Sequence, residues 1–423
     1  MSKENLQAAL AKQGAFGKDI DLTQYDNSDV AHVQSEADIS EEGKALMEHV
    51  GIELSTENRS ASFMQVDNTV LEPKIKAQTP LELMNTGKAA EKYPELVEKY
   101  WWKAVAPDTD KYTAVTALEK ENGYFIRVKA GEKITYPLQA CIFISHEEQL
   151  QRVHNIVIVE DGAELNVITG CSSDPSVDKA IHLGISEFYI GKNAKLTYTM
   201  IHSWGENVAV RPRSATIIDA GGQFISNYVC MEKAKDVQMN PLTRLVGEGA
   251  VARMNSILVA PEGAHLDIGG VVSLEVPGCR AEIVARTICT GGEIVNRGTL
   301  IGKAEGIRAH LECNGLMLSE KGYISAIPQL DAYTGNAEMS HEAAVGRIAP
   351  EEIDETSVCD SRTLLISEET QKVYLPYTID EVMKKFRIPV IILSLMCIIA
   401  VVFLIVAALI GNTKTTIKVI LLL

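Results

Sequence analysis

The stretch GAVARMNSILVAPEGAHLDIGGVVSLEVPGCRAEIVARTICTGG, residues 249–292, sets three short turns among runs of alternating apolar and polar residues. Turns of this kind recur between about residues 150 and 330. They are Gly162-Ala163, Asn193-Ala194, Gly221-Gly222, Gly249-Ala250, Gly263-Ala264 and Gly291-Gly292. The step from Gly249 to Gly263 is half as long as the steps on either side of it. A step of about 28 residues, or half of it, is typical of a solenoid whose stacked coils bury their inward side chains. The sequence therefore predicts coils of short strands.

Gly or Asn at the corners fits this prediction, because both residues accept the positive φ that a sharp turn often needs. The alternative is an ordinary antiparallel sandwich with Gly-containing turns. Hairpin signals of the Asn-Gly or Asp-Gly type are scarce, and Asp161-Gly162 is the clear case. The long period favours coils over hairpins.

Composition narrows the function classes. The chain has 423 residues, of which 46% are apolar, and a formal net charge of -16. An acidic chain without a Lys/Arg cluster in the periodic region argues against nucleic-acid binding. The eight cysteines stand singly with no CxxC, so closed zinc sites are not expected. Residues 1–20 resemble no secretory signal, so we expect a cytoplasmic body with reduced cysteines.

The two ends of the chain differ from the periodic core at 126–350. Residues 1–125 are predicted to be a helical region, with one helix from Ser40-Glu41-Glu42 to Gly51 and a second in AAEKYPELVEKYWWKAV, anchored by Tyr100, Trp101 and Trp102. Residues 52–62 read as a polar link. After a linker at 351–387, residues 388–410 form an uncharged run of 23 residues. That length predicts a transmembrane helix, the alternative being a buried helix.

No catalytic motif appears: the chain has no GxxxxGK[ST], no GxSxG and no HExxH. His341 and Glu342 are side by side, and imidazole and carboxylate both ligate iron, although neighbouring side chains on a strand point opposite ways. Cys313 lies one full step of the repeat before His341, which would place it directly beneath His341 if the period holds. A surface His-Glu pair and a buried structural Cys are the ordinary alternatives.

Four segments together resemble the SufB/SufD family of scaffold subunits of the SUF iron-sulfur assembly system. They are RVHNIVIVEDGAELNVITGC (152–171), GGVVSLEVPGCRAEIVARTICTGG (269–292), LECNGLMLSEKGYISAIPQLDAY (311–333) and EMSHEAAVGRI (338–348). The likeness extends over about residues 60–350. It implies a mainly β fold with a right-handed parallel β-helix core.

The resemblance is closer to the SufB type and implies that Cys313, Glu342 and His341 hold a transient iron-sulfur cluster. Thiolate is a soft ligand for iron, whereas carboxylate and imidazole are harder and more easily displaced. Such a mixture suits a cluster that must later leave for an acceptor protein. The implied role is a scaffold and not an enzyme.

The resemblance also implies partners. Family members pair through their β-helix ends and bind a SufC ATPase of the ABC type. The absence of a Walker motif means that ATP use would come from that partner. We expect a homodimer, or a pair with a SufD-like sister, in which two copies of Cys313 and Glu342 could face one another.

The chain departs from the family after about Glu352, where the family's ATPase-receiving helices would follow. Either an anchor at 388–410 replaces them, or a fusion or frame change has altered the tail. Two other functions remain open: a membrane-tethered β-helix interaction protein without cofactor, and a β-helix lyase or hydrolase acting on acidic polysaccharide. The latter predicts secretion and clustered carboxylates, which this sequence lacks.

Overall fold

The computed structural model describes residues 3–29, 33–232, 234–347, 365–366 and 373–374. The chain divides into two compact units, Met1–Ile348 and Ala349–Leu423. In the second unit, β24 (Leu365–Ile366) pairs antiparallel with β25 (Val373–Tyr374). The repeated strands all lie in the first unit.

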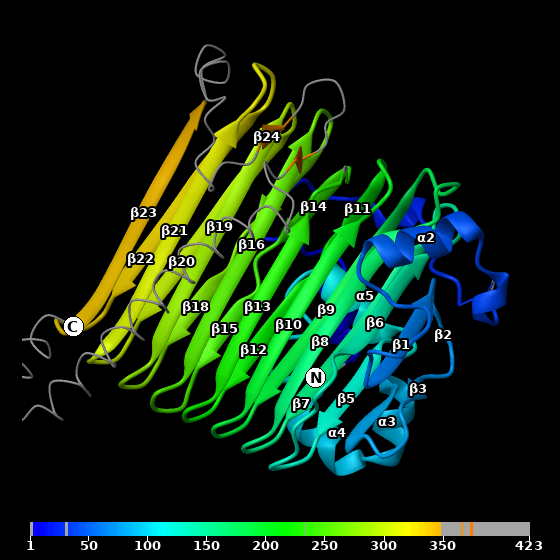
Figure 1. The fold of residues 1–423 in the computed structure, drawn as a ribbon, viewed down its shortest axis with the longest axis horizontal. Helices are drawn as coiled ribbons and strands as arrows, with labels where there is room; N and C mark the ends of the chain where they lie inside the picture. The colour runs from blue at the N-terminus through cyan, green and yellow to red at the C-terminus, as the bar shows by residue number, and fades with distance from the viewer. Residues whose placement is uncertain (1–2, 30–32, 233, 348–364, 367–372, 375–423) are drawn as a thin grey trace, which may run out of the picture. The chain divides into compact units, whose positions relative to one another are not determined.

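The first sheet has 11 strands and advances one coil at a time along the chain (Figure 1). Its strands are, in spatial order, β2 (Thr69–Val70), β1 (Ala61–Val66), β6 (Leu138–Ile144), β8 (Glu164–Ser173), β10 (Lys195–Ser203), β13 (Gln223–Cys230), β16 (Val251–Pro261), β19 (Arg280–Thr290), β21 (Ile307–Met317) and β23 (Ala337–Arg347), with β3 (Lys74–Ile75) also on β1. Every pairing from β1 to β23 is parallel.

The second sheet has 12 strands. They are β4 (Leu81–Asn85), β5 (Tyr124–Val128), β7 (Leu150–Val159), β9 (Ala180–Ile190), β12 (Arg213–Ile218), β15 (Leu242–Leu245), β18 (Val271–Leu274), β20 (Glu293–Gly302), β17 (His265–Ile268), β14 (Asp236–Met239) and β11 (Val208–Val210), with β22 (Tyr323–Ala332) on β20. The middle coils contribute two short strands each. Pro212 and Pro241 lie at two of these breaks, because proline has no N–H for the ladder.

These ladders confirm the predicted parallel β-solenoid and exclude the antiparallel sandwich. Along one inward row of the first sheet, each residue is the register partner of the next, one coil further on. The row consists of Ala140, Thr169, Met200, Tyr228, Ser256, Ala285, Cys313 and Ala343. The first residue of each of the six predicted turns has a positive φ. The four earlier turns lie where the chain passes from the second sheet to the first, whereas Gly263 and Gly291 lie where it passes from the first sheet to the second. This change of corner produces the step of half a period.

Inward and outward side chains alternate strictly on the central strands. In β19, the odd-numbered residues from Ala281 to Cys289 are buried and the even-numbered residues between them are more exposed. The buried set forms one continuous apolar core along the interior of the solenoid. This period of two is the physical origin of the alternation seen in the sequence.

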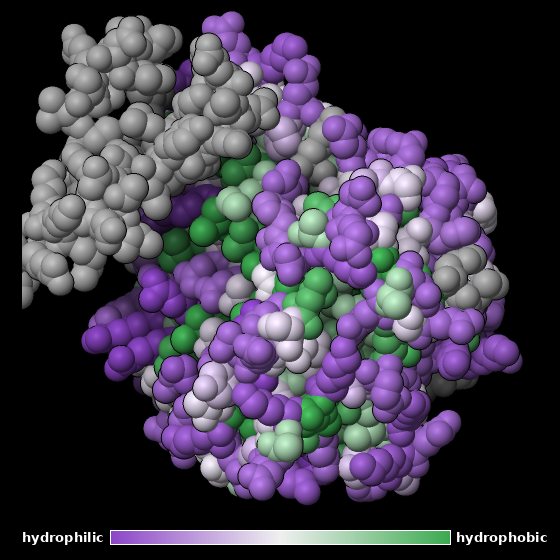
Figure 2. All heavy atoms as spheres, turned by 45° about the vertical axis from the view of Figure 1, so that its right-hand side comes forward, coloured by the Kyte–Doolittle hydropathy of each residue, from purple (hydrophilic) through white to green (hydrophobic). Residues whose placement is uncertain are grey.

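Helices gather at the N-terminal end of the ladder (Figure 1). They are α1 (Lys3–Ala9), α2 (Glu41–His49), α3 (Thr86–Lys92), α4 (Pro94–Tyr100) and α5 (Lys111–Leu118), with 3-10 turns at Leu22–Gln24 and Glu36–Asp38. The face in Figure 2 is mostly hydrophilic, with apolar residues in small groups. The helical region thus gives this end a polar surface.

The first predicted helix is confirmed as α2, whose N-terminus is capped by the Ser40 hydroxyl accepting from the Gly43 amide. The second predicted helical stretch is two helices, because Pro94 starts α4 directly after α3 ends. The solenoid also begins earlier than residue 126, since β1 and β4 already belong to its sheets.

No helix within the described ranges is long and apolar enough to cross a membrane. The predicted linker at 351–387 lies outside the described residues apart from β24 and β25. The predicted transmembrane helix at 388–410 lies wholly outside them.

Close stacking at one corner predicts the effect of a single methyl group. A Cβ on Gly247 would lie 1.8 Å from the backbone nitrogen of Ala220, so Gly247→Ala must displace the neighbouring coil. We expect the free energy of unfolding to fall by about 1–3 kcal/mol, measured by urea denaturation followed by circular dichroism. Gly335→Ala is the matched control, because nothing lies within 4 Å of a Cβ there. Equal stability of the two variants would contradict the expectation.

Candidate functional site

Cys313 lies on the inner face of β21, near the C-terminal end of the solenoid. Its register partners are Ala285 on β19 and Ala343 on β23, and the residue is only 2% exposed. Burial raises the pKa of the Cys313 thiol above its ordinary value, although Arg286 and Asn296 act in the opposite direction. The thiol is therefore held inside the coil rather than on its surface.

The structure corrects the expected alignment of Cys313 with His341. Leu311 is the register partner of His341, and Cys313 is that of Ala343. The prediction was wrong by two positions because the last step, from Cys313 to Ala343, is longer by two than the preceding step, from Ala285 to Cys313. Cys313 and His341 still belong to the same face, since residues two apart on a strand share one. Strand spacing and rise put their Cα atoms about 8 Å apart.

Glu342 belongs to the opposite, outer face of the sheet. It is the register partner of Glu312, which accepts hydrogen bonds from Arg286 Nη2 at 2.8 Å and Asn314 Nδ2 at 2.9 Å. Glu342 makes no hydrogen bond or ion pair with any other described residue. The three candidate ligands are thus near one another, but one chain does not bring all three to one point.

The last coil is uncovered among the residues that the structure describes. His341 and Glu342 are both exposed. Large apolar side chains are exposed on β22, β23 and the turn between them: Tyr323 (44%), Ile327 (42%), Tyr333 (72%) and Val345 (46%). Within the described ranges, no group of three His, Cys, Asp or Glu side chains is arranged to hold a metal ion.

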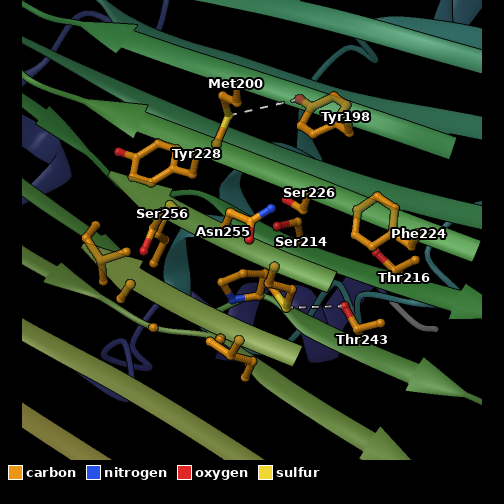
Figure 3. A pocket seen from close by; sticks show the side chains of 18 of the residues that line it. Tyr198, Met200, Ser214, Thr216, Phe224, Ser226, Tyr228, Thr243, Asn255 and Ser256 are labelled. Atoms are coloured by element: carbon orange, nitrogen blue, oxygen red, sulfur yellow. Dashed lines mark hydrogen bonds between the residues drawn. The ribbon is translucent and has the colours of Figure 1, made fainter. Parts of the chain in front are cut away.

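A cavity of about 60 Å³ lies between the two sheets, on the N-terminal side of Cys313. Figure 3 shows Ser214, Thr216, Ser226, Tyr228 and Ser256 among its lining residues. The lining also includes methionines, and Met254 accepts a weak hydrogen bond from Thr243. The sequence analysis missed this cavity, although hydroxyl residues at inward strand positions are a usable signal. Its walls therefore combine hydroxyl groups with a larger apolar surface.

The sequence analysis also missed a second buried polar group, which lies on the outer face of the second sheet. His154 on β7 is 1% exposed and contacts two carboxylates, Glu121 through Nδ1 at 2.9 Å and Glu187 through Nε2 at 2.9 Å. The indole of Trp102 stacks on the imidazole with ring centroids 4.0 Å apart. Each carboxylate is 33 residues from His154 in the sequence, which is close to one coil period. This spacing was the sequence signal that could have placed the carboxylates near His154.

Glu187 joins this group to the N-terminal segment. It accepts hydrogen bonds from the backbone amides of Trp102, Ala104 and Val105. Burial acts to lower the pKa of His154, but the two carboxylates outweigh it and raise the pKa to about 9. Burial acts to raise the pKa of Glu187, but the hydrogen bonds from His154 and the amides hold it below its ordinary value. The pair is therefore an imidazolium and a carboxylate at neutral pH, and it fixes residues 102–105 to the sheet.

Comparison with known proteins assigns the family. Residues 142–353 match the model of the SufBD core domain of the SUF system for FeS cluster assembly. The chain is a SufBD family protein. An iron-sulfur cluster assembly SufBD family protein of Archaeoglobus fulgidus is 47% identical over 310 residues, covering 73% of this chain and 83% of that protein.

Two further SufBD relatives support the assignment. A SufBD family protein of Methanothermobacter thermautotrophicus is 39% identical over 355 residues, 82% of this chain and 86% of the relative. The iron-sulfur cluster assembly protein SufB of Bacillus subtilis is 26% identical over 342 residues, 79% of this chain and 73% of the relative. The resemblance noted in the sequence is thereby confirmed, and the β-solenoid is the matched core.

Proposed function

We propose that this SufBD protein is a scaffold that holds a nascent iron-sulfur cluster and releases it to acceptor proteins. The observation that carries the proposal is the position of Cys313 on the inner face of β21 and of His341 on the same face of β23 in the uncovered last coil, with Glu342 on the outer face beside His341. The cluster is cargo in this proposal, and the role is not enzymatic.

The ligand chemistry supports transient holding. A thiolate binds iron strongly, whereas the exposed imidazole and carboxylate are harder ligands that are more readily exchanged. Among the described residues, one chain supplies too few convergent side chains to complete a cluster site. The exposed apolar residues of the last coil favour completion by a second subunit, either another copy of this chain or a SufD-like sister.

The remaining parts of the proposal follow from SUF family membership. The chain carries no Walker motif, so a SufC-like ABC-type ATPase would supply nucleotide-driven movement. We place the scaffold in the cytoplasm. A right-handed winding of the coils and a membrane anchor at 388–410 remain predictions from the sequence.

The test is anaerobic reconstitution with ferrous iron and sulfide, followed by visible absorption spectroscopy of the desalted protein. The scaffold role predicts sulfur-to-iron charge-transfer absorption that disappears when an acceptor apoprotein is added. The experiment is run on the full chain alone and with its ATPase. A protein that gains no such absorption under either condition is not a cluster scaffold.

A further inference from the structure

A second cavity, of about 40 Å³, lies inside the solenoid between β8 and β10 of the first sheet and β9 of the second. Its volume exceeds the roughly 15 Å³ that a water-sized body needs. None of the described residues that line it is Asp, Glu, Lys or Arg. The cavity can therefore hold one small ligand, and no charged side chain of this kind on its walls would balance the charge of that ligand.

Two potential ligands reach this cavity from neighbouring strands. His202 on β10 is the register partner of Cys171 on β8, and both residues are 2% exposed and line the cavity. Neighbouring strands lie about 4.8 Å apart. Metal–nitrogen and metal–sulfur bonds of about 2.0 and 2.3 Å put the two donor atoms of a linear site roughly 4 Å apart. The strand spacing therefore suits an ion held between these two side chains.

The imidazole of His202 has one ring nitrogen engaged and one without a partner. Nδ1 lies 3.0 Å from the Tyr228 hydroxyl, whereas Nε2 is buried and has no hydrogen-bond partner among the described residues. A buried polar atom without a partner costs free energy. Histidines that bind metals usually make a hydrogen bond through the other ring nitrogen, as Nδ1 does here. Nε2 is thus the atom that a ligand in the cavity would satisfy.

The chemistry of the donor atoms selects the kind of ion. Thiolate and thioether sulfur favour Cu(I), and imidazole also suits copper. Met200, two residues before His202 on the same face of β10, brings a thioether to the cavity wall, and its sulfur lies 4.0 Å from the Tyr198 hydroxyl (Figure 3). A monovalent ion on one thiolate is neutral overall, whereas a divalent ion would leave a charge unbalanced in the interior.

We propose that Cys171 and His202 form an interior site for a soft monovalent metal ion, Cu(I), with the Met200 thioether beside them. On binding, the sulfur of Cys171 exchanges its proton for the metal, the proton passes to the solvent, and no electron is transferred. Two ligands suffice for Cu(I), so the site needs no group of three His, Cys, Asp or Glu side chains. The proposed cluster ligand Cys313 belongs to β21, and β13, β16 and β19 separate that strand from β10, so the inference does not depend on the scaffold role.

The test measures how much Cu(I) the full chain retains under anaerobic conditions against the chelator bicinchoninate. Cys171→Ser and His202→Gln are each expected to retain about one equivalent less than the unmodified chain, because each removes one of the two ligands. X-ray absorption at the copper edge should show nitrogen and sulfur neighbours in the unmodified chain. Circular dichroism establishes that each variant is folded, and Cys171→Ala, which introduces no polar group, repeats the test.

The matched control is Cys230→Ser. Cys230 is the other register partner of His202 and is 1% exposed, but it does not line the cavity, and its thiol is directed to the carbonyl of Glu232, 4.0 Å away. This variant should retain as much Cu(I) as the unmodified chain. Unchanged retention in the Cys171 variants, or an equal loss in Cys230→Ser, overturns the inference. The assay contains no iron or sulfide, so its outcome is separate from that of cluster reconstitution.

Discussion

Cys313→Ser is expected to remove most of the cluster that the chain assembles. Serine is nearly isosteric with cysteine, and the site is a buried position between two alanines, so the fold is retained while the soft ligand is lost. We expect the iron and acid-labile sulfide bound after anaerobic reconstitution to fall at least about tenfold, since a hydroxyl is a poor ligand for this iron. Iron and sulfide analysis of the desalted protein measures the effect.

The matched control is Cys289→Ser on the neighbouring strand β19. Cys289 is also buried on an inner face, but its thiol donates to the carbonyl of Gly292 at 3.1 Å, a bond that serine reproduces. Cluster content should remain near normal in this variant. If both serine variants assemble clusters as well as the unmodified chain does, Cys313 is removed from the ligand set.

His154→Ala is expected to produce the largest loss of stability. It removes the imidazolium partner of Glu187, a carboxylate with no solvent exposure, and it also removes the ring on which Trp102 stacks. Breaking a buried ion pair in this way costs about 3–5 kcal/mol. Urea denaturation should show the loss. Amide hydrogen exchange should quicken at residues 102–105, which Glu187 holds.

The pH dependence gives an independent check on the same pair. The pKa of His154 is raised in the folded protein from 6.5 to about 9, so its contribution is complete below pH 6.5 and is lost as the pH rises through about 9. The lowered pKa of Glu187 works the other way: its contribution is present above 4.5 and is lost as the pH falls through the folded-state pKa.

The unmodified protein should therefore lose stability between about pH 6.5 and 9, and the double variant His154→Gln, Glu187→Gln should not lose it in that window. The double variant removes both charges while it keeps hydrogen-bonding side chains of similar size. Parallel pH profiles for the two proteins would show that the pair is not charged in the folded state.

Much of the fold could be predicted because the turns report the period directly. Each of the six predicted turns begins with a glycine or asparagine of positive φ, and this need of the local backbone is visible in a single sequence. The start of the solenoid was harder to place. The strand β1 is buried at all six positions and has no polar alternation, because a layer covers its outer face as well.

The sequence identified the candidate residues of the site but not how they are arranged in space. The repeat period correctly placed Cys313 and His341 on neighbouring strands. The last coil is two residues longer than the one before it, so the register between these strands is shifted by two residues. The length of a loop leaves little trace in the amino-acid composition. His154 and Glu187 were overlooked because their meeting depends on a diagonal offset between neighbouring strands, from Ile185 to Glu187.

The two ends of the described ladder differ, and the difference limits how identical copies associate. At one end, helices and antiparallel strands such as β4 end the parallel pairing. At the other, β23 is an edge strand paired only with β21 among the described strands. Two copies that paired through this edge would each use their exposed edge strand in the contact, so such pairing would stop at two copies rather than continue into a fibre.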